Sequence, residues 1–136
     1  MAPCWLDNHE KAGGHVLSRH VYQNITSQTG LTDRDLLSRL AANTKITGAS
    51  RFNSIQDAES VISQALKSDR YQIRSWANTA IAGDRRVVDY NGPINIGRYA
   101  AKGSTTLAQV IDVTNVRVVL VSKGYGKYYI LTAFPR

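Results

Sequence analysis

The sequence is poor in cysteine and has no long hydrophobic run. Cys4 is the single cysteine in 136 residues, which excludes an intramolecular disulfide and a zinc site built from cysteines. No apolar run approaches the roughly 20 residues that span a bilayer, and the N-terminus lacks the apolar region of a signal peptide. Export is therefore expected to depend on information outside this chain. Stability must come from a hydrophobic core, which the 43% hydrophobic content allows.

Acidic residues are also scarce relative to basic ones. Seventeen Lys and Arg stand against ten Asp and Glu, which gives a net charge of +7 at neutral pH. This balance favours polyanionic partners, either nucleic acid or an acidic protein surface, but charge alone fits a basic domain without such a partner equally well. The GxGxxG, P-loop and GxSxG motifs are absent, and no cofactor is expected.

The pattern of glycine and proline divides the chain unequally. The first 13 residues contain Pro3 and end next to a glycine pair, and we expect a weakly structured leader or linker remnant there. Residues 14–136 are expected to form a single domain, because no repeat or low-complexity tract divides them. Its first helix is expected over about Gly14–Tyr22, followed by a polar loop over Gln23–Gly30.

Further helices are predicted from capping residues and apolar spacing. Thr32 precedes an acidic residue at the third helical position, and Ser54 stands in the same relation to Asp57. The helix after Ser54 carries apolar residues at a helical period and should end near Lys67. The segment Arg70–Ala80 favours a short helix, with a strand as the alternative.

The last third of the sequence has the character of strands. Runs of β-branched and aromatic residues are separated by glycine-containing turns. These runs are Arg85–Tyr90, Ile94–Ala100, Val116–Ser122 and Tyr128–Phe134. Helices followed by strands predict an α+β fold with an antiparallel sheet.

Two histidines near the start of the first predicted helix are candidates for proton transfer, because imidazole titrates near neutral pH. His15 and His20 are five residues apart, about 140° around a helix, so both cannot point at one atom from regular helical positions. His20 shares a face with Val16 and is placed beside the core, while His15 shares a face with Arg19. This spacing does not suit a metal site, and none is predicted.

An arginine and a threonine further along the chain suit phosphate contact. Arg39 lies near the edge of an apolar helix stripe, where it either packs its stem on the core or clamps a phosphate. In the last strand, period-two alternation places Tyr128, Thr132 and Phe134 on one face, where a hydroxyl and rings could contact phosphate or a base. Arg98 and Lys123 add positive charge beside flexible backbone.

These segments together resemble a known family. The ordered motifs GGHVLSRHV, TDRDLLSRLAAN, ASRFNSIQDAESVISQAL, IGR, VRVVLV and YYILTAFP are similar to the ribonuclease-A-like toxin domains at the C-termini of bacterial contact-dependent growth inhibition and other polymorphic toxin proteins. The resemblance covers nearly the whole chain, from about Gly13 to Pro135. It implies a kidney-shaped, ribonuclease-A-like fold without disulfides.

The resemblance also implies an activity and a site. Such domains are metal-independent ribonucleases delivered into the cytoplasm of neighbouring bacteria and neutralised in the producer by an immunity protein. Their active-site cluster carries over to His20, Arg39 and Thr132. Some relatives have a tyrosine where this chain has Phe134. The loop over Tyr22–Leu31 is also longer than the connector we expect in the family.

The expected reaction is endonucleolytic cleavage of RNA by attack of its 2′-hydroxyl, which leaves a 2′,3′-cyclic phosphate. His20 is assigned as base, Arg39 as charge stabiliser and Thr132 as a positioning donor. The acid stays open among His15, Lys127 and Tyr128, with Phe134 in a supporting position.

Expected contacts outside this cluster concern substrate and partner. Arg19, Arg98 and Lys123 are expected to bind substrate, and the Lys123–Lys127 turn is expected near the cleft, where an acidic immunity protein would bind. We expect a monomer outside that complex and no membrane insertion. The alternative function is a non-catalytic basic module that binds RNA or protein, which explains the charge equally well.

Overall fold

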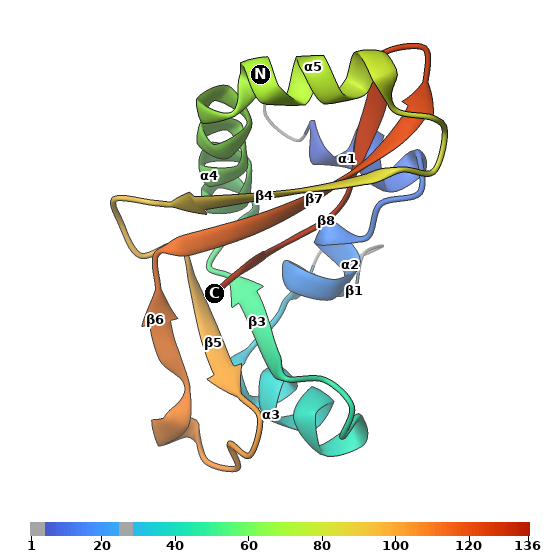
Figure 1. The fold of residues 1–136 in the computed structure, drawn as a ribbon. Helices are drawn as coiled ribbons and strands as arrows, with labels where there is room; N and C mark the ends of the chain where they lie inside the picture. Colours follow the sequence, from blue (N-terminus) through green and yellow to red (C-terminus); the bar gives the residue numbers. More distant parts are fainter. Residues whose placement is uncertain (1–4, 25–28) are drawn as a thin grey trace.

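The computed structural model describes residues 5–24 and 29–136, drawn in sequence order in Figure 1. The helices are α1 (Leu6–Lys11), α2 (Val16–His20), α3 (Asp33–Ala42), α4 (Ile55–Ser68), α5 (Arg70–Thr79) and the 3-10 helix η1 (Leu107–Gln109). The strands are β1 (Tyr22–Asn24), β2 (Thr29–Gly30), β3 (Gly48–Phe52), β4 (Arg85–Asn91), β5 (Gly97–Ala101), β6 (Ile111–Val113), β7 (Asn115–Gly124) and β8 (Lys127–Pro135). In the part of the chain that is described, no helix is long and apolar enough to cross a membrane.

The longer helices begin at the capping residues that the sequence indicated. The Thr32 hydroxyl accepts the Asp35 N–H at 3.3 Å, and the Asp35 carboxylate accepts the Thr32 N–H at 2.7 Å, a complete capping box for α3. Ser54 caps α4 by accepting the Asp57 N–H at 3.0 Å. The segment after Arg70 is helical rather than extended.

The strands form two antiparallel three-stranded sheets, ordered β4-β7-β8 and β3-β5-β6, and a two-stranded sheet of β1 and β2. The small sheet shows that the expected loop over Gln23–Gly30 is wrong at its two ends, which pair as strands. Helices α4 and α5 contact the first sheet and α3 contacts the second, so the molecule has two lobes (Figure 1). The expected α+β, ribonuclease-like fold is confirmed. Strands β3 and β6 were not expected, because β3 opens with Gly-Ala-Ser and β6 has only three residues.

The N-terminal segment is more ordered than the sequence suggested. The expectation of weak structure over residues 1–13 is wrong from residue 5 onward, because α1 inserts the fully buried Leu6 into the main core. The Leu6 N–H also donates to the Glu59 carboxylate of α4 at 3.1 Å. Cys4 and the middle of the expected loop, residues 25–28, lie outside the described residues.

A bulge in β8 changes which side chains share a face. Val119 pairs with Thr132 while Leu120 pairs with Ile130, so Leu131 is an extra residue on this strand. Ile130 and Ala133 consequently both point into the core. Thr132 faces away from the core, and the expected common face with Tyr128 is therefore wrong.

We expect the Leu6→Ala substitution to lower the free energy of unfolding by about 2–5 kcal/mol, because it removes a fully buried side chain and leaves a cavity. Urea denaturation followed by far-ultraviolet circular dichroism measures this change. The control is Asn8→Ala on the exposed side of α1, which should change stability by less than about 0.5 kcal/mol. Equal effects of the two substitutions would show that α1 does not belong to the cooperative core.

Candidate active site

A cleft of about 470 Å³ lies where α2 contacts strands β3 and β8. It is lined by His15, Arg19, His20, Lys45, Ile46, Thr47, Gly48, Ser50, Tyr99, Arg117, Thr132, Phe134 and Arg136. The predicted residues that the structure brings together here are His15, Arg19, His20, Thr132 and Phe134. Their convergence depends on contacts between segments more than 100 residues apart in the sequence.

His20 is the last residue of α2 and is held from both sides. Its Nδ1 lies 3.1 Å from the carbonyl oxygen of Ser50 on β3, an atom that can only accept a hydrogen bond. Nδ1 therefore carries the proton of the neutral ring, and Nε2 is left as the proton acceptor. The Phe134 ring packs against the imidazole, with ring centroids 5.5 Å apart.

The surroundings of His20 keep its ring neutral. Burial is the main cause that lowers the pKa of His20 from 6.5 to about 3, and the hydrogen bond to the Ser50 carbonyl opposes it. The positive charges of Arg39, His15 and Arg19 lower the pKa further. At neutral pH the ring of the free protein is therefore unprotonated at Nε2.

Two polar atoms beside His20 have no partner within the described chain. The Nδ1 of His15 and the Oγ1 of Thr132 are both buried without a hydrogen bond. They are brought together because the His15 N–H donates to the carbonyl of Leu131 at 2.7 Å, which attaches the start of α2 to the β8 bulge. Buried polar groups without partners are costly in a folded protein and often mark a position that a ligand satisfies.

Arg39 lies beside this cluster rather than in the cleft lining. Its Nη2 donates to the main-chain carbonyl of Arg19 at 2.6 Å, across the end of α2. Burial, followed by the charge of Arg19, lowers the pKa of the Arg39 guanidinium. The contribution of Arg39 to the pKa of His20 shows that its charge acts on the site.

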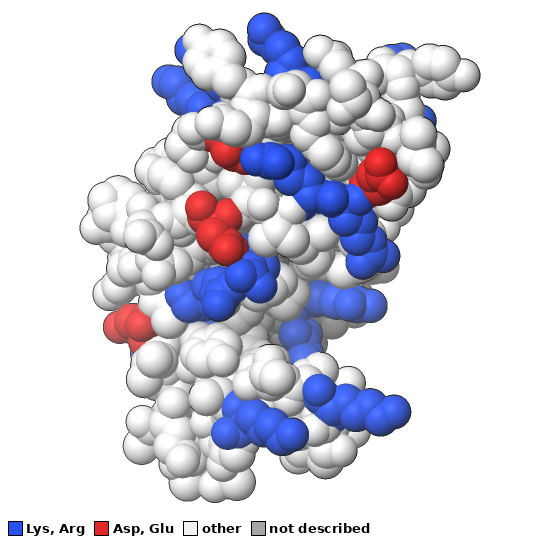
Figure 2. All heavy atoms as spheres, in the orientation of Figure 1, with Lys and Arg blue, Asp and Glu red and all other residues white. Residues whose placement is uncertain are grey.

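Positive charge dominates the cleft. Arg19, Lys45, Arg117 and Arg136 line it, and none of the described lining residues is acidic. Asp89 stands nearby and accepts from Arg117 at 2.7 Å. Figure 2 shows Lys and Arg spread over most of the visible face of the molecule, with Asp and Glu mainly in its upper and left parts. The described residues contain no cluster of His, Cys, Asp and Glu placed to hold a metal ion.

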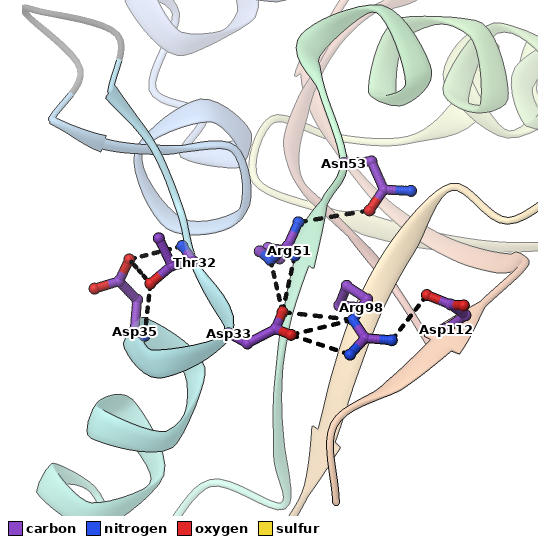
Figure 3. Close-up of polar contacts among 7 residues, drawn as sticks. All are labelled: Thr32, Asp33, Asp35, Arg51, Asn53, Arg98 and Asp112. Carbon is purple, nitrogen blue, oxygen red and sulfur yellow. Dashed lines mark hydrogen bonds and ion pairs between the residues drawn. The ribbon is translucent and has the colours of Figure 1, made fainter. Parts of the chain in front are cut away.

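Arg98 does not reach the cleft, contrary to the expectation. It donates to Asp33 at 3.0 Å and to Asp112 at 2.9 Å, and Asp33 also accepts from Arg51 at 2.8 Å (Figure 3). Burial raises the pKa of Asp33, but the hydrogen bonds from Arg98 and Arg51 outweigh this and hold it below its ordinary value. This network attaches the start of α3 to strands β3, β5 and β6, and thereby sets where Arg39 lies.

The β7–β8 hairpin also lies apart from the described cleft lining, so the expectation that its lysines stand near the cleft is wrong. Lys123 is 5.6 Å from the centre of the Tyr129 ring, and Lys127 is exposed. Tyr128 packs against Trp76 of α5, with centroids 6.3 Å apart, on the side of β8 that faces the main core. Of the three acid candidates, His15 alone lines the cleft.

The start of α2 and the β8 bulge are braced by residues of α1. The Ile130 N–H donates to Nδ1 of His9 at 2.9 Å, and the Leu17 N–H donates to the Glu10 carboxylate at 2.9 Å. Gly14 permits the close approach, because a Cβ there would overlap the carbonyl oxygen of Ile130. The sequence analysis proposed no role for His9, because it expected this segment to be a weakly structured leader.

Sequence reasoning missed the second wall of the cleft. Lys45, Tyr99 and Arg136 belong to none of the quoted motifs, and Arg117 was quoted only as part of VRVVLV, without a role in the site. The pairing of β3 with β5 and of β7 with β8 brings these residues to the cleft. Ser50 contacts His20 through its main-chain carbonyl. Every residue has this group, so the residue type at position 50 could not indicate the contact.

Comparison with known proteins identifies the class. The chain matches the family model of the bacterial CdiA-CT RNase A domain over residues 14–135. It belongs to this family of ribonuclease toxin domains. A chain in the crystal structure of a CdiA-CT/CdiI complex from Y. kristensenii has a similar fold, with 30% sequence identity and a TM-score of 0.72 over 90% of this chain and 99% of that chain. No curated protein sequence matches the chain.

The pKa of His20 predicts how stability depends on pH. Between pH 6.5 and about 3 the unfolded chain binds a proton at this ring and the folded chain does not, so stability falls as the pH drops through this window. Each such group changes the free energy of unfolding by at most about 1.4 kcal/mol per pH unit. Urea denaturation at several pH values should show a shallower dependence for His20→Asn, which keeps a donor for Ser50. Parallel profiles for the two proteins would contradict the lowered pKa.

Proposed function

We propose that the chain is an endoribonuclease that cleaves RNA with side chains alone, by attack of the 2′-hydroxyl on the adjacent phosphodiester. The observation that carries the proposal is His20, a neutral imidazole with a fixed tautomer, placed in a cleft rich in positive charge. The cleft attracts a polyanion, and Nε2 offers the base that activates the hydroxyl. The product is an RNA end with a 2′,3′-cyclic phosphate.

The low pKa of His20 suits a base only when substrate is bound. A base that holds its proton poorly is inefficient at neutral pH. The negative charge of a bound phosphodiester opposes the positive charges of Arg39 and Arg19, which are among the causes of the low pKa. Substrate binding therefore raises the pKa of His20 towards the range in which it can accept and hold the 2′-hydroxyl proton.

The remaining roles follow from the atoms around His20. Thr132 Oγ1 donates to a non-bridging phosphate oxygen, which supplies the partner that it lacks among the described residues. Arg39 and Arg19 offset the charge that builds up on the phosphorane. His15 is the acid for the leaving 5′-oxygen, because bound phosphate raises its pKa, which burial and the charges of Arg19 and Arg85 lower in the free protein.

Phe134 takes a supporting role without chemistry of its own. Its ring carries no hydroxyl, so it cannot donate the proton or the hydrogen bond that a tyrosine would supply at this position. Packing against the imidazole, it limits rotation of the His20 ring and leaves an aromatic face toward the cleft. A base of the substrate can stack on this face.

We expect the purified chain to cleave single-stranded RNA in excess EDTA and to leave a 2′,3′-cyclic phosphate, detected by mass spectrometry. RNA with a 2′-deoxy residue at the scissile position should resist, because it lacks the internal nucleophile. His20→Ala and Arg39→Ala should each lower kcat/KM at least about 10²-fold, while Arg34→Ala on the exposed side of α3 should not. Binding of RNA without cleavage would instead support a non-catalytic module.

A leaving group that needs no proton tests the acid. His15→Ala should lower kcat/KM at least about 10²-fold with a dinucleotide substrate. The decrease should be much smaller with a nucleoside 3′-(p-nitrophenyl phosphate), because its nitrophenolate leaves without a proton. Equal losses with both substrates would remove His15 from the acid role. The same pair of substrates applied to His20→Ala should show equal losses, because both reactions need the base.

We further propose that the chain acts as a toxin in the cytoplasm of competing bacteria and is neutralised by an immunity protein. Support comes from the family and from the Y. kristensenii structure, which contains a CdiA-CT/CdiI complex. The positive cleft favours an acidic partner that covers it, because an inhibitor competing with RNA meets the same charges. Lys45 is one of the exposed cations of the cleft lining, and it makes no ion pair with a described acidic residue.

Association with the cognate immunity protein should be fast at low salt and should slow as salt screens the charges. Lys45→Glu should lower the association rate constant more than it raises the dissociation rate constant, as measured by stopped-flow fluorescence. The paired control is Lys123→Glu with Lys127→Glu, a larger charge change on the β7–β8 hairpin, which does not line the cleft. Association rates that stay constant over a tenfold range of salt would refute electrostatic recognition.

A further inference from the structure

A second hollow of about 540 Å³ opens beside the catalytic cleft, between the end of α3 and the turn after β5. Its floor is apolar and includes Leu37, Leu40, Ala41 and Ile46. Its rim carries hydroxyl and amide groups, among them Ser38, Asn43 and Thr105. An apolar floor with a few polar groups around it is the usual lining of a small-molecule site.

The hollow and the catalytic cleft share one wall, the segment 43–48. Asn43 and Thr44 line the hollow, Lys45 and Thr47 line the cleft, and Ile46 lines both. The wall has a defined shape, because the Lys45 N–H donates to the Asn43 side chain at 3.1 Å. The hollow and the cleft are therefore neighbours on either side of this segment.

Each of the two hollows has an exposed lysine in its lining. Lys45 stands on the shared wall, and Lys102 stands on the rim of the hollow. The Lys102 N–H donates to the Thr47 carbonyl at 2.9 Å, which holds the turn after β5 against that wall. Both lysines are exposed, and no ion pair with a described acidic residue neutralises either.

We propose that this hollow is a base subsite, which binds one base of a single-stranded RNA outside the nucleotides joined by the scissile bond. A base has a flat apolar face and a hydrogen-bonding edge, which match the floor and the rim. The adjoining phosphates lie within the field of Lys45 and Lys102. The inference rests on the proposed ribonuclease function and extends it to longer substrates.

A substitution that fills the hollow distinguishes the contribution of this subsite from that of the catalytic cleft. Ala41→Phe should lower kcat/KM for a hexanucleotide about tenfold, mainly through KM, and leave the value for a dinucleotide unchanged within twofold. The size follows from the loss of contacts to one base. The matched control is Ala42→Phe on the neighbouring exposed position of α3, which does not line the hollow. Thr105→Trp fills the hollow from its opposite side and should give the same result. This second variant keeps the test possible if the Ala41→Phe protein does not fold.

A binding measurement makes the test independent of catalysis. The hexanucleotide should bind His20→Ala protein about tenfold more tightly than His20→Ala with Ala41→Phe, measured by fluorescence anisotropy at fixed salt. If the wild type cleaves neither substrate, the ribonuclease proposal fails while this binding result still decides the subsite. The base subsite would be overturned if Ala41→Phe lowered kcat/KM equally for both substrates, or if it left hexanucleotide binding unchanged. It would also be overturned if the substitution weakened only the binding of the immunity protein.

Discussion

The hydrogen bond from His20 to the Ser50 carbonyl is the contact on which the rest of the site depends. It joins the last residue of α2 to the middle of β3, and so ties the N-terminal helices to the second lobe. It also decides which ring nitrogen carries the proton, because a carbonyl can only accept. One interaction therefore fixes both the position of the His20 ring and the nitrogen that carries its proton. A displacement of α2 relative to β3 would break this hydrogen bond and lose both.

That bond holds only because α2 is itself braced. A helix of five residues has little stability of its own, and the His15 side chain makes no capping bond. Instead, the Leu17 N–H donates to the Glu10 carboxylate, and the His15 N–H, two positions earlier, donates to the carbonyl of Leu131. The β8 bulge thus serves two purposes, since it offers that carbonyl and turns Thr132 toward the cleft. The segment before residue 14, which the family model does not cover, contributes to the geometry of the site.

Elements formed by contacts between residues close in the sequence could be predicted, and elements formed by contacts between distant residues could not. Caps and apolar periods are local, so the helices after Thr32 and Ser54 could be predicted with their first residues. The bulge at Leu131 depends on pairing with β7, and an alternation rule applied to β8 alone therefore placed Tyr128 and Thr132 together. Arg98 was misplaced for a similar reason, because its carboxylate partners are 65 and 14 residues away. The family resemblance supplied His20, Arg39 and Thr132 as a cluster, and the structure adds how main-chain atoms hold His20 and Arg39.

The free site combines features that are unfavourable without a ligand. Positive charges surround a neutral imidazole, and two buried polar atoms lack partners within the described chain. In the reaction that we propose, a bound phosphodiester would relieve both, since it would supply negative charge and oxygen acceptors at once. The unfavourable interactions of the free site would then be offset on binding, most fully when charge peaks on the proposed phosphorane. Preorganised positive charge of this kind stabilises the transition state more than the ground state, which is the condition for catalysis rather than mere binding.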